Sequence, residues 1–186
     1  MEFHPLKIAG CYEIRLTPRW DARGYFMRTH DTALFAAQGL VTAWAQENQS
    51  RSVRRGVLRG LHFQKPPHAE TKLIRCLVGA VFDAFLDLRA GSPTFGQWDA
   101  VRLAAESHNA VYLPKGIAHG FCCLTDEAVV TYKVDSPYVP EAEGGVRWDS
   151  AGIDWPPVGS CQVSDKDQQL PPLAAVRAAL PGFSFP

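Results

Sequence analysis

The sequence predicts an all-β fold, a sandwich or jelly roll with a few short helices at its flanks. Three observations support this prediction. Fifteen glycines and fourteen prolines recur at short intervals and divide the middle of the chain into brief runs. Those runs alternate between apolar and polar residues with a period of two, as half-buried strands do. Helical periodicity is confined to two flanking segments, and many strands with few helices are typical of sandwiches and jelly rolls.

The clearest strand covers residues 81–88, where Val81, Asp83, Phe85 and Asp87 share one face and four apolar residues share the other. This alternation predicts a strand with one wetter side. Similar strands are predicted at residues 97–103, 110–113, 120–124 and 128–134, with turns at 90–93 and 114–116 between them.

Short helices are predicted at residues 31–38, ended by Gly39, and at residues 173–180, which lie between two Pro-containing segments. No repeat, low-complexity tract or linker interrupts the 186 residues. We therefore expect one domain, residues 1–186, with a single barrel whose mouth could bind a small ligand.

The composition narrows the classes of function. Nineteen basic residues balance nineteen acidic ones, whereas general binders of nucleic acid or anionic membranes need a basic excess. We therefore expect neither partner. Five cysteines without a CxxC pair do not fit a disulfide framework or a structural zinc site. The N-terminus lacks the pattern of a signal peptide, and the longest apolar stretch, residues 76–82, is too short to cross a bilayer. The predicted location is the cytoplasm.

Some polar residues occupy unusual positions in the predicted strands. His62 would share a strand face with Gly60 and Gln64, which leaves space beside the imidazole, although for a lone histidine a core residue bonded to a backbone carbonyl is the more common explanation. Lys72 opens an apolar run, and lysine is seldom buried without a partner. Tyr132 shares a face with two valines, so its hydroxyl is expected to point inward.

Arginine is concentrated near the N-terminus, where eight of the thirteen arginines fall within the first 60 residues. Arg51, Arg54, Arg55 and Arg59 form the densest group. Because guanidinium groups match phosphate oxygens in geometry, this group favours a phosphorylated ligand, with a solvated basic loop as the competing explanation.

Residues 114–121 (PKGIAHGF) resemble the second sequence motif of the cupin superfamily. Metal-binding cupins also need a His-x-His pair, but here His62 is followed by Phe63 and Gln64. His62, His68 and His119 could in principle hold a metal, yet their spacing does not favour it. We therefore expect no metal and no cofactor.

Taken together, the motifs resemble the dTDP-4-dehydrorhamnose 3,5-epimerase family in the same order over residues 21–167. They are residues 56–64 (GVLRGLHFQ), 66–73 (PPHAETKL), 87–96 (DLRAGSPTFG), 114–121, 132–133 (YK), Tyr138 and 148–156 (WDSAGIDWP). The resemblance implies a cupin-type jelly-roll barrel, a metal-free homodimer, and an epimerase of a nucleoside-diphosphate 4-keto-6-deoxy sugar.

The resemblance also implies catalytic roles. His62 aligns with the general base that removes the proton beside the C4 ketone, and Lys72 with the cation that stabilises the enolate. Tyr132 aligns with the acid, whose ionisation a nearby ammonium would ease. Asp167 aligns with the carboxylate that orients the base, although a register slip would exchange it with Asp165.

Further residues align with the family's ligand contacts. They are Arg23, Phe26, Gln46, Asn48, Arg59, His119, Tyr138, Glu143 and Lys166. Arg59 should point away from His62 under strict alternation, so it would reach the same ligand only through a bulge or across a dimer.

One position departs from the family: Arg28 stands where a glutamate that helps to hold the nucleotide is common. A guanidinium donates hydrogen bonds, whereas a carboxylate accepts them. This leaves a CDP- or GDP-linked sugar as an alternative to dTDP, unless Arg28 points to solvent or pairs with the diphosphate. Three competing activities also stay open: an epimerase of C3 or C5 alone, a non-catalytic sugar-nucleotide-binding cupin, and a metal-dependent cupin oxygenase.

Overall fold

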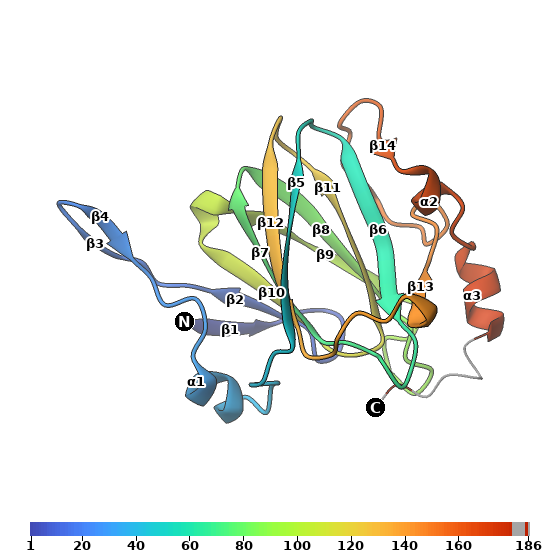
Figure 1. Ribbon diagram of the computed structural model, residues 1–186, viewed down its shortest axis with the longest axis horizontal. Coiled ribbons are helices and arrows are strands. Elements are labelled where there is room, and N and C mark those ends of the chain that lie inside the picture. The colour runs from blue at the N-terminus through green and yellow to red at the C-terminus, as the bar shows by residue number, and fades with distance from the viewer. Residues whose placement is uncertain (180–184, 186) are drawn as a thin grey trace.

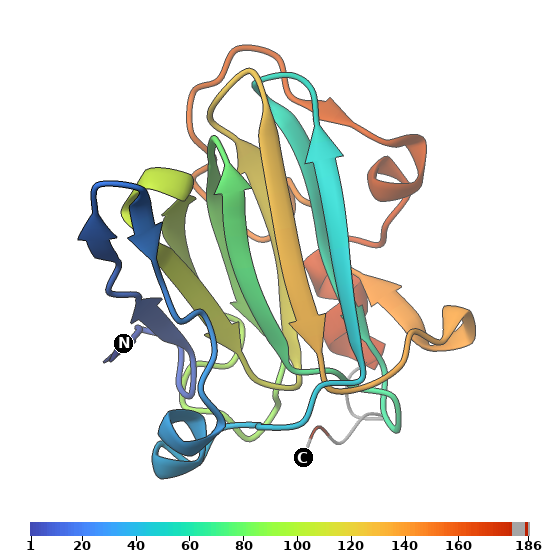
Figure 2. The ribbon, with the colours of Figure 1, turned by 60° about the vertical axis from the view of Figure 1, so that its left-hand side comes forward.

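The computed structural model describes residues 1–179 and residue 185, and its main body consists of two six-stranded sheets that face each other (Figures 1 and 2). The first has the order β1-β2-β10-β7-β12-β5, with strands Glu2–Pro5, Tyr12–Arg15, Asn109–Leu113, Lys72–Val78, Ala128–Val134 and Gln46–Ser52. The second has the order β13-β6-β11-β8-β9, with strands Glu143–Gly145, Val57–Gln64, Ile117–Cys123, Ala80–Asp87 and Trp98–Ala104, and β14 (Gln162–Val163) pairs with β6.

The remaining elements lie outside these sheets. A hairpin of β3 (Arg19–Asp21) and β4 (Gly24–Phe26) extends away from them, on the side opposite to α2 (Asp165–Gln168) and α3 (Leu173–Ala179) (Figure 1). Helix α1 (Thr32–Ala37) covers one end of the first sheet, and two 3₁₀ turns occur at Ala105–Ser107 and Pro140–Ala142.

The main core lies between the sheets. Ile74, Val111 and Val130 from the first sheet pack with Phe85 and Leu103 from the second. A second cluster lies on the outer face of the second sheet, where Leu86 and other residues meet α3. The predicted all-β jelly-roll class with short flanking helices is confirmed.

Most predicted elements are present with small differences at their ends. The strand at residues 128–134 matches β12, and the others match β8, β9, β10 and β11 within three residues. The predicted helices match α1 and α3, with residue 180 outside the described residues. Helix α2 was not predicted, since its four residues are too few to show helical periodicity.

The prediction that β8 has one wetter side is wrong. Asp83 and Asp87 are both 0% exposed, like Ala84, Leu86 and Leu88 on the other face. Each is buried with polar partners: Asp83 pairs with His119, and Asp87 accepts hydrogen bonds from Arg89 and from two hydroxyl groups. Buried carboxylates are tolerated when they are paired in this way, so alternation alone did not reveal solvent exposure.

Strand β6 departs from regular alternation. His62 lies opposite His119 on β11, whereas Arg59, three residues earlier, lies opposite Phe121, only two residues later. His119 and Phe121 are two apart and share a face, so this bulge brings Arg59 and His62 to the same face. Of the two routes by which Arg59 could reach the ligand of His62, the bulge is therefore present within the chain.

Gly60 does not leave space for a ligand beside the imidazole, contrary to the prediction. Its φ is +117°, and a Cβ there would lie 2.5 Å from the Cα of Gly120 and 2.7 Å from the carbonyl oxygen of His119. Glycine is therefore required because the backbones of β6 and β11 approach closely at the bulge.

Candidate active site

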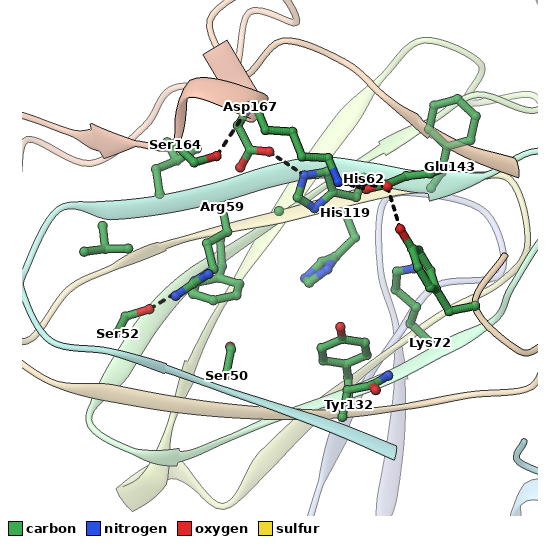
Figure 3. Close-up of a pocket in the computed structure, with 18 of the residues that line it drawn as sticks. Ser50, Ser52, Arg59, His62, Lys72, His119, Tyr132, Glu143, Ser164 and Asp167 are labelled. Carbon is green, nitrogen blue, oxygen red and sulfur yellow. Dashed lines mark hydrogen bonds and ion pairs between the residues drawn. The ribbon is translucent and has the colours of Figure 1, made fainter. Parts of the chain in front are cut away.

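A cavity of about 780 Å³ opens between the two sheets (Figure 3). Its walls come from β5, β6, β7, β11 and β12, and β13 and α2 border it. It brings together eleven of the residues predicted from the sequence: Gln46, Asn48, Arg59, His62, Lys72, His119, Tyr132, Tyr138, Glu143, Lys166 and Asp167.

His62 and Asp167 form a hydrogen-bonded pair at one end of the cavity. The Nε2 atom of His62 lies 2.7 Å from Oδ1 of Asp167, whose Oδ2 accepts a bond from the Gly60 N–H at 3.0 Å (Figure 3). Ser164 caps α2 by accepting a bond from the Asp167 N–H at 3.1 Å. This short capped helix therefore fixes the carboxylate against β6.

The charge state of Asp167 selects the tautomer of His62. Burial alone would raise the pKa of Asp167, but the hydrogen bonds from His62 and Gly60 outweigh it and lower the pKa. An ionised carboxylate only accepts, so Nε2 carries a proton, and in the neutral imidazole Nδ1 is then the atom with the lone pair. Asp165, the alternative by register, is exposed on α2 and does not line the cavity.

Lys72 is 6% exposed and forms an ion pair with Glu70, a residue that the sequence analysis missed. Glu70 precedes β7, and the only sign of it in the sequence was its position two residues before a buried lysine.

The Lys72–Glu70 pair also corrects the expectation that a nearby ammonium eases the ionisation of Tyr132. Burial raises the pKa of its phenol, and the charge of Glu70 raises it further. The Lys72 ammonium does not lower the pKa of Tyr132 overall, because Glu70 offsets the charge of Lys72.

His119 forms a second imidazole–carboxylate pair in the cavity wall. Its Nε2 lies 2.9 Å from Oδ2 of Asp83, and Oδ1 of Asp83 has no partner among the described residues. Burial raises the pKa of Asp83 although His119 opposes this effect. Among residues 1–179 and 185, no group of three or more His, Cys, Asp or Glu side chains is arranged to hold a metal ion.

A polar network joins several of the residues that line the cavity. The Tyr138 hydroxyl donates to Glu143 at 2.8 Å, and Lys166 donates to both oxygens of Glu143 at 2.7 and 2.8 Å. The Tyr138 N–H donates to the side-chain oxygen of Gln46 at 2.5 Å. These bonds connect β5, the segment before β13, and α2.

Strand β5 contributes a polar inner face. Gln46, Asn48, Ser50 and Ser52 alternate along it and line the cavity, and the Arg59 guanidinium donates to the Ser52 hydroxyl at 3.3 Å. The sequence analysis missed both serines, although alternation from Gln46 and Asn48 could have identified them. Polar donors and a guanidinium suit a phosphorylated, hydroxyl-rich ligand.

Residues 5–175 match the family model of dTDP-4-dehydrorhamnose 3,5-epimerase. The chain belongs to this family. Two curated relatives cover 96% of it: a dTDP-4-dehydrorhamnose 3,5-epimerase of Mycolicibacterium smegmatis, 43% identical over 89% of its length, and a dTDP-4-dehydrorhamnose 3-epimerase of Streptomyces niveus, 44% identical over 87%.

A solved structure of a relative has the same fold as this chain over nearly its whole length. It is the dTDP-6-deoxy-D-glucose-3,5-epimerase of Legionella pneumophila Philadelphia 1 in complex with dTDP-4-keto-L-rhamnose. The two chains are 36% identical, cover 96% of each other, and superpose with a TM-score of 0.90.

Three predicted ligand contacts of this epimerase lie outside the cavity of the single chain. Arg23 and Phe26 are on the projecting β3–β4 hairpin, where Arg23 pairs with Asp21 at 2.7 Å and Phe26 is 70% exposed. Arg28 pairs with Asp31 at 2.7 Å, and Asp31 caps α1. Within one chain these residues therefore do not reach the other candidate site residues.

Proposed function

We propose that this enzyme inverts C3 and C5 of dTDP-4-dehydro-6-deoxyglucose to give dTDP-4-dehydrorhamnose. One observation carries the proposal: an imidazole–carboxylate pair, a buried ammonium and a phenol line one cavity (Figure 3). The Legionella relative holds a product-type sugar nucleotide in the same fold, which supports the choice of substrate.

The proposed reaction begins with proton removal. Nδ1 of His62 takes the proton from the carbon beside the C4 ketone, and its bond electrons form the enolate. Lys72 stabilises the charge on the ketone oxygen, a contribution on the order of several kcal/mol for preorganised charge. Tyr132 then gives its phenolic proton to the opposite face of that carbon, and the ketone re-forms as the configuration inverts.

Exchange of substrate protons with solvent tests the general base. His62→Ala should abolish deuterium incorporation beside the ketone in D₂O, because no other group would remove that proton. His4→Ala, an imidazole loss on β1 away from the cavity, is the matched control and should keep the wild-type rate. Undiminished incorporation in His62→Ala would refute the assignment.

The nucleotide carrier and the number of inverted carbons are tested together. We propose dTDP as the carrier, and Arg28 does not oppose it, because its guanidinium is engaged by Asp31. NMR of the enzyme with the 4-keto-6-deoxyglucose derivatives of dTDP, CDP and GDP in D₂O should show exchange at both carbons, and only with dTDP. Exchange at C3 alone would instead match the named activity of the Streptomyces niveus relative.

We also propose that the enzyme is a homodimer in which the β3–β4 hairpin carries Arg23 and Phe26 to the partner's cavity. The hairpin projects from its own chain, and Trp20 on it is 67% exposed, which favours a covered surface (Figure 1). Coexpressing Arg23→Ala with His62→Ala should restore roughly a quarter of the wild-type activity, since half the dimers have one complete site. If Arg23 acted within its own chain, nothing would be restored.

No described helix is long and apolar enough to cross a membrane. All five cysteines are free thiols, and four are buried. These thiols support our proposal that the enzyme works in the reducing cytoplasm.

A further inference from the structure

Four ionisable side chains meet at one end of the cavity. Lys166 and Asp167 are consecutive on α2, and Glu143 begins β13, which pairs with β6 so that Gly145 lies opposite His62. The His62–Asp167 hydrogen bond and the Glu143–Lys166 ion pair thus lie next to each other, with Glu143 and Asp167 on different sides of the imidazole (Figure 3).

Glu143 and Lys166 are both charged in this arrangement. Burial would raise the pKa of Glu143, but Lys166, Tyr138 and the nearby His62 lower it. The hydrogen bond to Glu143 raises the pKa of Lys166. With Asp167 ionised, Asp167, Glu143 and Lys166 together carry two negative charges and one positive charge, so protonation of the neutral imidazole makes this group of four side chains neutral.

We propose that Glu143 and Lys166 act in opposite directions on the pH at which His62 becomes free to act as a base, and that their pairing keeps the two effects in balance. The two residues are positioning residues in this role, because they act through His62 rather than on the reacting carbon. The inference rests on the proposed function only in taking His62 as the general base, since protonation of His62 is measurable without substrate.

Other charged or titratable groups line the same cavity and stay constant in the variants below. They are Arg51, Arg59, Glu70, Lys72, His119, Tyr132, Tyr138 and Asp167. Lys72 is already paired with Glu70, and His119 with Asp83. The Glu143–Lys166 pair differs because its lysine side chain is 64% exposed, so Lys166 can be changed with little effect on packing, and Glu143→Gln keeps the shape of the other side chain.

The test changes one charge of the pair at a time. Glu143→Gln leaves Lys166 without its counter-charge and should lower the titration midpoint of His62 by about 0.5–1 pH unit, while Lys166→Gln should raise it by a similar amount. The midpoint is followed by the imidazole proton resonance, assigned by its loss in His62→Gln. The acid limb of the kcat/KM profile should move in the same opposite directions.

Matched controls separate this effect from a general structural one. Glu141→Gln removes an exposed carboxylate from the same loop and should leave the midpoint unchanged. The double variant Glu143→Gln/Lys166→Gln should return close to wild type. At about 1 M NaCl both single shifts should shrink, because the pair is partly exposed.

Shifts in the same direction, or no shift in either single variant, would overturn the proposal. If one variant does not fold, the direction of the other still decides. Failure of the proposed function would look different: the wild-type enzyme would exchange no substrate protons, while the His62 resonance would still titrate.

Discussion

Replacing Asp167 with asparagine tests the reasoning about the active site most directly. The two oxygens of Asp167 accept from two donors, the Gly60 N–H and the His62 imidazole. Asparagine has the same shape but only one acceptor atom. Because the Gly60 N–H is a fixed donor, the amide oxygen should turn to it, and the NH₂ group should face Nε2 of His62.

This exchange would force the imidazole into the opposite tautomer. Nε2 would accept from Asn at position 167, and Nδ1, the atom proposed to remove the substrate proton, would carry a proton itself. A charge-assisted hydrogen bond contributes about 1.5–3 kcal/mol, and each 1.36 kcal/mol is a factor of ten, so orientation alone accounts for roughly 10- to 150-fold in kcat. With the tautomer reversed, we expect a loss of at least about 100-fold.

Stability should change much less than activity. The Gly60 bond is retained, so the free energy of unfolding should fall by about 1 kcal/mol, a shift of roughly 2–4 °C in Tm. The assay is deuterium incorporation beside the ketone, followed by NMR, together with thermal unfolding. Asp165→Asn, an exposed change on the same helix, is the matched control and should keep near wild-type exchange. More than half the wild-type rate in Asp167→Asn, or an equal loss in Asp165→Asn, would refute the argument.

Three further predictions concern other parts of the molecule. Tyr132→Phe should retain deuterium exchange but suppress inversion, since the base can return a proton only to the face it came from; normal inversion would exclude this phenol as the acid. Asp87→Asn should lower the free energy of unfolding by about 2–3 kcal/mol at pH 7, measured by urea denaturation. Burial opposes ionisation of Asp87, yet hydrogen bonds from Arg89 and two hydroxyls lower its pKa. The stability that ionised Asp87 contributes is therefore present above the ordinary aspartate pKa near 4 and is lost as the pH falls below that value. A stability deficit of Asp87→Asn that persists at about pH 2 would contradict this. Gly60→Ala should cost about 1–3 kcal/mol through its clash with β11, whereas Gly91→Ala, with no atom within 4 Å of its Cβ, should be nearly neutral; equal Tm values would refute the clash.

The strands from β8 to β12 could be predicted because each satisfies a local rule. Period-two alternation and turn residues define β8 through β12 within a few positions, and Gly39 marks the end of α1. Alternation says which residues share a face, but it does not say whether that face meets water. Asp83 and Asp87 were therefore assigned to a wetter side, although partners distant in sequence allow their burial.

In the active site, too, some residues could be identified from the sequence and others only from the structure. Unusual positions in the predicted strands, together with the order of the family motifs, identified His62, Lys72 and Tyr132, and all three line the cavity. The Glu70 partner of Lys72 and the projection of the β3–β4 hairpin could not be predicted in this way, because each depends on what lies across the fold.

By itself, the sequence determined the all-β class, the family and most of the side chains available for chemistry. Only the tertiary structure decided that Asp167 rather than Asp165 meets His62, and that a bulge turns Arg59 to the same face. The physical reason is the separation along the chain over which each effect acts. Propensity and alternation act between neighbours along the chain, whereas a hydrogen bond across 105 residues or one extra residue in a strand pair depends on how separate strands align.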